Sequence, residues 1–251
     1  MPYKIAVLMG GTSFEREFSL GSGRHILRTL EAAGHEVLPL DTTESLVGIL
    51  REQRPDVAYI ALHGKNGEDG TVQSLLEYLD IPFVGSSSSA CRFAWNKSML
   101  PAVVGAYRRC VGATGTASAT GTTATTATGP ASWPQHVFLA AVAFKSMGAA
   151  GALDLMTTRI TTGYPLAVMP ACGGSAMGVS KVETPEALAP ALLDALSFDE
   201  AVLIEEWVSG VELAVCVVGT GDDAYVLPPV EICPKQGFFS TSARLDPDLV
   251  D

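Results

Sequence analysis

Short, almost wholly apolar segments alternate with amphipathic segments over the first 85 residues, and this alternation constrains the fold more than any other feature. Residues 4–9 (KIAVLM) and 56–62 (DVAYIAL) contain few polar side chains, which is typical of strands that are buried on both faces. Residues 15–33 have a helical period instead, and Gly34 marks the end of that helix. Strands and helices that alternate in this way predict a parallel sheet with helices on both faces.

The same alternation locates the edge of the sheet at which a ligand would bind. The predicted strands are residues 4–9, 36–40, 56–62 and 82–85, and the predicted helices are residues 15–33, 43–53 and 70–79. Ligands bind beyond the carboxyl ends of the strands in a parallel sheet. We therefore expect the loops after Met9, Leu62 and Val84 to share one edge.

The pattern changes in the second half of the chain. Residues 112–131 consist only of Gly, Ala, Thr, Ser and Pro, and this composition has too little apolar surface to offset the entropy of ordering. We predict a flexible segment there, and at most a helix in the Ala-rich residues 133–162. Regular structure is predicted again after residue 163, with strands at 165–169, 179–182, 201–208, 212–218 and 224–232 and a helix at 184–195 that begins with Thr184 and Pro185.

These elements predict an α/β protein of three parts. The N-terminal domain (1–96) has a doubly wound, Rossmann-like parallel sheet, and an irregular segment with the low-complexity stretch follows it (97–162). The last part (163–251) combines antiparallel strands with a helix. We expect it to be an incomplete α+β domain, because the chain ends at Asp251 without a closing helix or strand.

Charge, hydropathy and cysteine usage exclude several classes of protein. The chain has 16 basic and 27 acidic residues, a net charge of −11, whereas a general nucleic-acid binder needs the opposite sign. No apolar run reaches the roughly 18 residues of a spanning helix, and the N-terminus is typical of a strand rather than a signal peptide. The scattered cysteines, without a CxxC pair, indicate a reduced, cytoplasmic protein. They are Cys91, Cys110, Cys172, Cys216 and Cys233.

The loop after the first predicted strand, residues 10–17 (GGTSFERE), combines glycines and hydroxyls with an acid at the start of a helix. Glu15 falls in the first helical turn, where the helix dipole favours a carboxylate. Two interpretations are open: Glu15 is an ordinary capping acid, or its carboxylate holds a substrate ammonium.

The loop after the third predicted strand, residues 63–70 (HGKNGEDG), is more specific. Its three glycines allow a backbone with positive φ, and a histidine and two acids stand among them. A single histidine is more often structural, but His63 lies at the expected ligand-binding edge of the sheet. The position therefore favours a substrate contact over a structural one.

A third loop, residues 171–178 (ACGGSAMG), lies between two predicted strands. A glycine-rich hairpin of this kind can fold over phosphates with its backbone amides. It is not a Walker loop, since no GKS or GKT follows it, and an ordinary flexible hairpin is the alternative.

Taken together, these three loops resemble the D-alanine–D-alanine ligase family, which has the ATP-grasp fold. The resemblance is close over residues 3–97 and looser over residues 163–245. The segments that carry it are GGTSFEREFSL at 10–20, HGKNGEDGTVQSLLE at 63–77, IPFVGS at 81–86, GGSAMGVSKV at 173–182 and LIEEWVSGVEL at 203–213.

The resemblance implies a role for individual residues. Glu15 and His63, with Gly64, match positions that hold the first D-alanine, and Ser175 matches a loop serine beside the reacting alanines. Arg244 lies roughly where a mobile loop of the family carries a lysine, so that Glu15, Ser175 and Arg244 form the implied catalytic set. The implied nucleotide-binding residues are Lys97, Met169, Gly174, Ser175, Glu205, Val208 and Glu212.

Within the nucleotide set, the resemblance assigns Lys97 to the phosphates, Glu205 and Val208 to the adenine, and Glu212 to the ribose. Met169 departs from the family, which has a phosphate-binding lysine there, and Ala176 replaces a serine. The loss of a charge-assisted phosphate contact costs roughly 1.5–3 kcal/mol. The magnesium ligands of the family lie in a later segment, and we expect none in this chain.

The resemblance also implies the reaction and the partners. The family uses ATP and Mg²⁺ to activate the carboxylate of one D-alanine as an acyl phosphate, which the amine of a second D-alanine attacks to give the dipeptide for peptidoglycan synthesis. Positive side chains, amides and magnesium must neutralise the charge of the phosphoryl group during its transfer. D-alanine is thus the expected small-molecule partner. We expect the chain to bind neither nucleic acid nor a membrane, and to form a homodimer through the N-terminal domain.

Three hypotheses remain open at this stage. The chain is a cytoplasmic ligase, whose catalysis the departures at Met169 and in the magnesium site would impair. Alternatively, it is a non-catalytic homologue that binds D-alanine, a dipeptide or a partner subunit. The third possibility is a variant of the family that joins D-alanine to D-lactate or D-serine.

Overall fold

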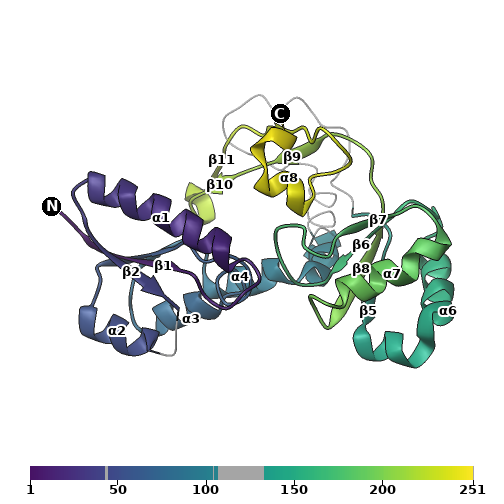
Figure 1. Ribbon diagram of the computed structural model, residues 1–251, viewed down its shortest axis with the longest axis horizontal. Coiled ribbons are helices and arrows are strands. Elements are labelled where there is room, and N and C mark those ends of the chain that lie inside the picture. Colours follow the sequence, from purple (N-terminus) through teal and green to yellow (C-terminus); the bar gives the residue numbers. More distant parts are fainter. Residues whose placement is uncertain (43–44, 104, 107–132, 251) are drawn as a thin grey trace. The chain divides into compact units, whose positions relative to one another are not determined.

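The computed structural model describes residues 1–42, 45–103, 105–106 and 133–250. The low-complexity segment predicted to be flexible, residues 112–131, lies outside the described residues. The chain folds into two compact units, each with a sheet and a core of its own (Figure 1). The first is Met1–Ala102 with Cys172–Gly174, and the second is Val103–Ala171 with Ser175–Asp251.

The first unit contains the parallel sheet that the sequence predicts. Its strands lie in the order β2-β1-β3-β4, and every neighbouring pair is parallel. In chain order the elements are β1 (Lys4–Met9), α1 (Arg16–Ala32), β2 (Glu36–Asp41), α2 (Leu46–Gln53), β3 (Val57–Ile60), α3 (Thr71–Tyr78), β4 (Phe83–Val84), α4 (Ser88–Trp95) and the 3-10 helix η1 (Lys97–Met99).

Both faces of this sheet are covered, as the continuous apolar strands require. Helix α1 packs on one face, while α2 and α3 lie on the other (Figure 1). Because successive side chains of a strand point to opposite faces, Val7 faces the α1 side and Leu8 the α2–α3 side, and both are fully buried. The doubly covered parallel sheet predicted from the sequence is therefore confirmed.

The strand order places a switch point between β1 and β3. The chain leaves β1 for β2 on one side and then returns to β3 on the other side of β1. The loops after β1 and β3 consequently start side by side at the carboxyl edge of the sheet, which is where such sheets bind ligands. Gly34 ends α1 in a Schellman motif, since its N–H bonds Glu31 O and the N–H of His35 bonds Leu30 O.

The second unit is built on an antiparallel sheet with the order β5-β8-β6-β7. Its core lies between this sheet and two helices. Met156 and Ile160 come from the helix after β5 and its C-cap, and Leu188 and Leu192 come from the helix after β7. The elements are β5 (His136–Ala140), α6 (Ala141–Arg159), β6 (Leu166–Pro170), β7 (Ser180–Val182), α7 (Pro185–Ala195) and β8 (Ala201–Glu206).

The expectation of at most a helix over residues 133–162 was incomplete, because β5 precedes α6 there. Strand β5 lies at the edge of the sheet and buries only Val137 and Leu139, while Phe138 between them is 48% exposed. An apolar residue at the outward position removes the alternation by which a half-buried strand is recognised.

The strands predicted at 212–218 and 224–232 are broken into shorter pieces. They form two separate antiparallel pairs, β9 with β12 and β10 with β11. Pro228 and Pro229 separate β11 from β12, and a proline cannot donate a hydrogen bond to a neighbouring strand. The elements are β9 (Glu212–Ala214), β10 (Val217–Val218), η2 (Gly221–Asp223), β11 (Tyr225–Val226), β12 (Val230–Ile232), α8 (Thr241–Leu245) and η3 (Pro247–Leu249).

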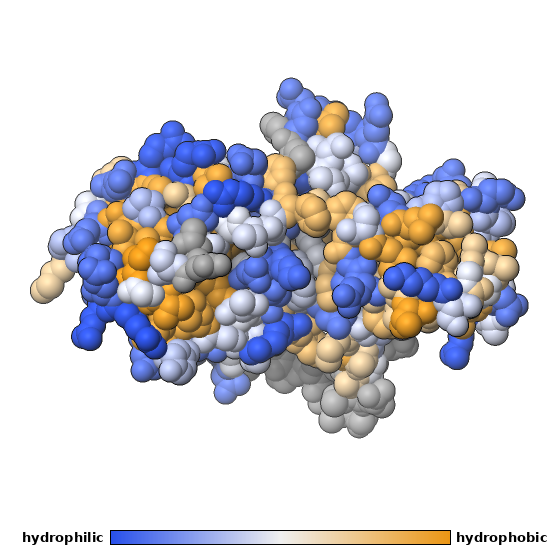
Figure 2. Space-filling view, turned by 60° about the horizontal axis from the view of Figure 1, so that its bottom comes forward, coloured by the Kyte–Doolittle hydropathy of each residue, from blue (hydrophilic) through white to orange (hydrophobic). Residues whose placement is uncertain are grey.

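The surface is mixed in character. Several large apolar side chains are exposed, among them Val217 and Val230. Figure 2 shows hydrophobic patches interrupted by hydrophilic side chains on the face that it displays. Within the described ranges, no helix is both long enough and apolar enough to cross a membrane.

Candidate functional site

Glu15 begins the site at the carboxyl edge of the first sheet. It occupies the N-cap position of α1, but its side chain makes no capping hydrogen bond. Only 4% of the residue is exposed, which is unusual for a glutamate. Of the two interpretations of Glu15, the geometry disfavours a simple capping acid and leaves a buried carboxylate at the switch point.

Two serines join the loop that carries Glu15 to the end of β3. The Ser13 hydroxyl donates to the carbonyl of His63 at 2.7 Å and accepts the backbone N–H of Glu15 at 3.2 Å. The fully buried Ser19 donates to the carbonyl of Ala61 at 2.9 Å and accepts a backbone N–H from the loop after β1. These bonds bring the first two predicted loops together at one edge, as the parallel topology requires.

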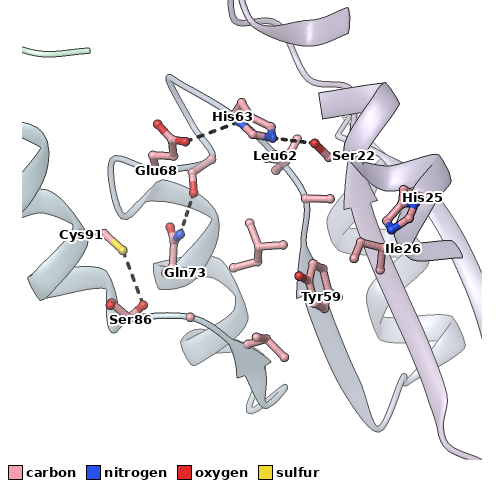
Figure 3. A pocket seen from close by; sticks show the side chains of 15 residues that line it. Ser22, His25, Ile26, Tyr59, Leu62, His63, Glu68, Gln73, Ser86 and Cys91 are labelled. Atoms are coloured by element: carbon pink, nitrogen blue, oxygen red, sulfur yellow. Dashed lines mark hydrogen bonds and ion pairs between the residues drawn. The ribbon is translucent and has the colours of Figure 1, made fainter. Parts of the chain in front are cut away.

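The imidazole of His63 has a protein partner at each ring nitrogen (Figure 3). Nε2 is 3.0 Å from the Ser22 hydroxyl on α1, and Nδ1 is 3.8 Å from Oε1 of Glu68. The sequence analysis singled out neither partner. The acid-rich GEDG sequence was a signal for Glu68, whereas Ser22 is recognisable only once α1 has been placed beside β3.

Gly64 lies against the Glu15 carboxylate. Its φ is +71°, and a Cβ atom at this position would collide with Glu15 Oε2. Both facts require glycine here, since a side chain would be strained by the backbone and would displace the carboxylate. The structure thus places Glu15, His63 and Gly64, the predicted substrate-binding residues, in one cluster.

Burial, in the first place, and the charge of Glu15, in the second, raise the pKa of the Glu68 carboxyl. The N–H of Gly64 and the nearby His63 act in the opposite direction. The side chain keeps 42% of its surface exposed to solvent, so the raised pKa reflects a partly hydrated acid beside a second acid.

A cavity of about 690 Å³ opens behind the His63 loop in the first unit (Figure 3). Tyr59, His63 and Glu68 line it together with the buried Gln73. The Gln73 amide nitrogen donates to the carbonyl of Gly67 at 2.7 Å, which holds the glycine-rich loop against α3. The cavity therefore has an apolar floor formed by the sheet and a polar wall formed by the loop.

Lys97 and two glycines of the third loop, Gly173 and Gly174, also belong to the first unit. The Lys97 ammonium donates to the carbonyl of Gly173 at 2.7 Å. Gly174 faces two carboxylates, because a Cβ atom there would lie 3.0 Å from Glu68 Oε2 and 3.6 Å from Glu15 Oε1. The two predicted nucleotide-binding residues of this unit, Lys97 and Gly174, are thus at the loop and not in the sheet.

The remaining predicted residues lie in the second unit. Met169 is half-buried on β6, opposite Leu203 of β8. Strands β6 and β7 form the hairpin that the third loop predicts, and Ser175 sits at its turn with φ +50°. The carbonyl of Ser175 accepts a hydrogen bond from Thr241 Oγ1 at 2.8 Å.

Glu205 is buried on β8, and its carboxylate accepts a hydrogen bond from the Trp133 indole at 2.5 Å. Val208 lies just beyond the strand and is 66% exposed, and Glu212 is exposed on β9. The Arg244 guanidinium stacks over the ring of a neighbouring phenylalanine at 4.2 Å from its centroid. Glu205 is therefore the one member of this group with a buried, oriented side chain.

Two aromatic contacts near the end of β8 were not predicted. The ring of Trp207 packs edge-on against Phe238 at 5.5 Å, and the ammonium of Lys181 lies 5.4 Å above the Trp207 ring. The Trp207 ring thus contacts both a cation and a second aromatic ring.

The described residues hold no group of three or more His, Cys, Asp or Glu side chains that could bind a metal ion. No disulfide joins the four cysteines in that part of the chain. Cys110 lies outside the described residues.

Family models and relatives agree with this geometry. Residues 47–86 match the model described as D-ala D-ala ligase N-terminus, and residues 139–248 match D-ala D-ala ligase C-terminus. A D-alanine–D-alanine ligase of Halalkalibacterium halodurans is 34% identical over 246 residues, which are 98% of this chain and 70% of the relative. This chain belongs to the D-alanine–D-alanine ligase family. A second such ligase, from Ectopseudomonas mendocina, is 34% identical over 241 residues, 96% of this chain and 66% of the relative.

Solved structures of the D-alanine–D-alanine ligase family share the fold. The D-alanine–D-alanine ligase of Bacillus anthracis in complex with ATP aligns with a TM-score of 0.66 and 28% identity, over 95% of this chain and 68% of that one. The VanG D-Ala:D-Ser ligase of Enterococcus faecalis gives a TM-score of 0.68 and 25% identity, over 96% and 72%. The family and the ATP-grasp fold inferred from the sequence are therefore confirmed.

Proposed function

We propose that this chain acts as an ATP-dependent D-alanine–D-alanine ligase that makes the dipeptide for peptidoglycan synthesis. The observation that carries the proposal is the buried Glu15 carboxylate, joined through Ser13 to the His63 loop at the switch point of a parallel sheet. A D-alanine zwitterion needs an acceptor for its ammonium and donors for its carboxylate. Glu15 provides the acceptor, and the amides of the His63 loop provide the donors.

The nucleotide site is proposed in the residues that the resemblance assigns. The Trp133 indole holds the carboxylate of Glu205 on β8, and the adenine is proposed to lie against Glu205 and Val208. The resemblance assigns Lys97 of the first unit to the phosphates. Bound ATP would supply the phosphoryl group that activates the first D-alanine. The family also uses Mg²⁺, whose ligands the resemblance places in a later segment.

A second function rests on one specific observation. At Met169 a neutral thioether stands where the family has a lysine, so this chain lacks one cation for the phosphates. A non-catalytic module that binds D-alanine is the function that this substitution favours.

We also propose a cytoplasmic location, because the scattered cysteines indicate a reduced protein, and a homodimer that forms through the N-terminal domain. The domain boundaries after residues 96 and 162 stay predictions.

A coupled assay of ADP release with D-alanine, combined with chromatography of the product, tests the proposal. We expect ADP to form only when D-alanine is present, together with an equal amount of dipeptide, and Glu15→Gln to abolish both. D-alanine binding without ADP release would support the non-catalytic alternative. ADP release with D-serine or D-lactate instead of a second D-alanine would indicate the corresponding variant of the family.

A further inference from the structure

Each of the two ring nitrogens of His63 lies near a protein side chain. Ser22 Oγ lies 3.0 Å from Nε2, and Glu68 Oε1 lies 3.8 Å from Nδ1. Figure 3 shows the imidazole between these two side chains. In the tautomer that carries its proton on Nδ1, the N–H points toward the Glu68 carboxylate. Nε2 then accepts a hydrogen bond from the Ser22 hydroxyl. The ring is therefore arranged to orient Glu68.

Glu68 approaches the same place as Glu15, as two glycines show independently. The N–H of Gly64 donates to the Glu68 carboxylate, while the position of the missing Gly64 side chain is filled by the Glu15 carboxylate. A Cβ atom on Gly174 would likewise meet Glu68 Oε2 at 3.0 Å and Glu15 Oε1 at 3.6 Å. Two carboxylates thus converge on one small space beside two glycines.

The charges around Glu68 indicate which kind of ligand group this space would bind. Burial is the main cause that raises the pKa of Glu68, the charges of Glu15 and Asp69 add to it, and the nearby His63 acts in the opposite direction. Asp69 is turned to the backbone of its own loop, where it accepts the N–H groups of Asn66 and Thr71 at 2.9 Å. Glu15 and Glu68 therefore face each other as a pair that a cation between them would stabilise.

We infer that Glu68 is a second carboxylate of the D-alanine site, which binds the substrate ammonium together with Glu15. His63 and Ser22 are then positioning residues that hold Glu68 in place. The inference rests on the proposed function, since it needs a D-amino acid in the Glu15 site. It changes the role expected for His63, which acts on the substrate through Glu68. An ammonium between two carboxylates also predicts that an amino acid binds more tightly than a hydroxy acid as the first substrate.

The first test follows the carboxyl group itself. In protein labelled with ¹³C at the glutamate carboxyls, the pKa of Glu68 is measured by NMR without ligand and with saturating D-alanine. We expect D-alanine to lower this pKa, because the ammonium favours the charged carboxylate. Glu15→Gln should lower it in the free protein as well, since the neighbouring charge is removed. A purely structural glutamate would respond to Glu15→Gln but not to D-alanine.

The second test measures the affinity for D-alanine by calorimetry. Glu68→Gln should weaken binding about tenfold, Ser22→Ala should weaken it less, and Glu68→Asp should restore part of the loss. Glu31→Gln, an exposed glutamate on the same helix as Ser22, is the matched control and should bind normally. If Glu68→Gln does not fold, the titration of Glu68 in the unaltered chain decides the question.

The two proposals fail in different ways. If the unaltered chain does not bind D-alanine, the proposed function and this inference are both wrong. If D-alanine binds and Glu15→Gln weakens it, while Glu68→Gln binds normally and D-alanine leaves the pKa of Glu68 unchanged, the function stands and the inference is overturned.

Discussion

Arg16 and Asp41 form a two-pronged ion pair, with Nη2 2.6 Å from Oδ2 and Nη1 3.1 Å from Oδ1. The pair also binds the backbone of Gly11, since Nη1 donates to its carbonyl at 2.8 Å and Oδ1 accepts its N–H at 2.9 Å. It thereby joins the end of β2 to the loop after β1. Because Arg16 follows Glu15 directly, this clamp holds the loop that places the Glu15 carboxylate.

The first prediction concerns Asp41→Asn. Arg16, by its hydrogen bonds and charge, holds the pKa of Asp41 below its ordinary value. The unfolded chain therefore binds a proton more readily than the folded one, and the ionised carboxylate stabilises the fold at neutral pH. This contribution is lost as the pH falls through the lowered pKa of the folded state.

Urea denaturation across the pH range checks this expectation. The free energy of unfolding of Asp41→Asn should be lower than that of the unaltered chain at pH 7, and the difference should shrink as the medium becomes acidic. Added salt should also reduce it, because the pair is partly exposed. A difference that grows toward low pH would contradict the assignment.

The second prediction compares two glycines with similar backbone conformations. Gly64 has φ +71° and Gly34 has φ +85°, so alanine at either position costs about 1 kcal/mol or more in backbone strain. Only at Gly64 would the new methyl group collide with Glu15, since Gly34 has open space around it. We expect both variants to be less stable and only Gly64→Ala to lose D-alanine binding, as measured by calorimetry. Equal affinity in the two variants would place Glu15 outside the site.

The third prediction concerns Ser13→Ala. This change removes the hydrogen bond to the His63 carbonyl and leaves the Glu15 N–H without its acceptor. At about 1 kcal/mol for a net hydrogen bond, D-alanine affinity should fall roughly fivefold. Ser87→Ala is the control, because it removes the N-cap of α4 and should lower stability by about 1 kcal/mol without affecting binding. A loss of affinity in both variants would indicate a general effect of stability.

The fourth prediction concerns Met169→Lys. Restoring a cation for the phosphates should tighten ATP about tenfold, the equivalent of roughly 1.4 kcal/mol. Met169→Gln has similar length but no charge and should leave the affinity unchanged. Calorimetry with ATP measures both variants. If Met169→Lys and Met169→Gln bind ATP alike, the residue does not face the phosphates.

The first sheet and its two site loops were predictable from the sequence because they depend on local patterns. The apolar runs at 4–9 and 56–62 mark buried parallel strands, and that topology alone brings Glu15 and His63 to one edge. The partners of His63 were not predictable in this way. Ser22 contacts His63 only because α1 lies beside β3 in the fold. The two residues are far apart in the sequence, so no local pattern indicates the contact.

The second unit was less predictable for a similar reason. The exposed Phe138 concealed β5, which is identified by its pairing with β8 and not by its own alternation. The apolar stretch at 224–232 indicated one strand, yet its two prolines divide it. The hydrophobic pattern predicts that such segments are strands. Where a strand is interrupted depends instead on which backbone groups can form hydrogen bonds with a neighbouring strand.

The most direct measurement is an NMR titration of ¹⁵N-labelled protein with D-alanine that follows the backbone amides of residues 10–17 and 63–70. The account predicts that both loops shift together, that L-alanine acts more weakly, and that Glu15→Gln suppresses the response without altering the rest of the spectrum. If neither loop responds to D-alanine at tens of millimolar, which corresponds to less than about 3 kcal/mol of binding, the switch point of the first sheet is not a D-alanine site.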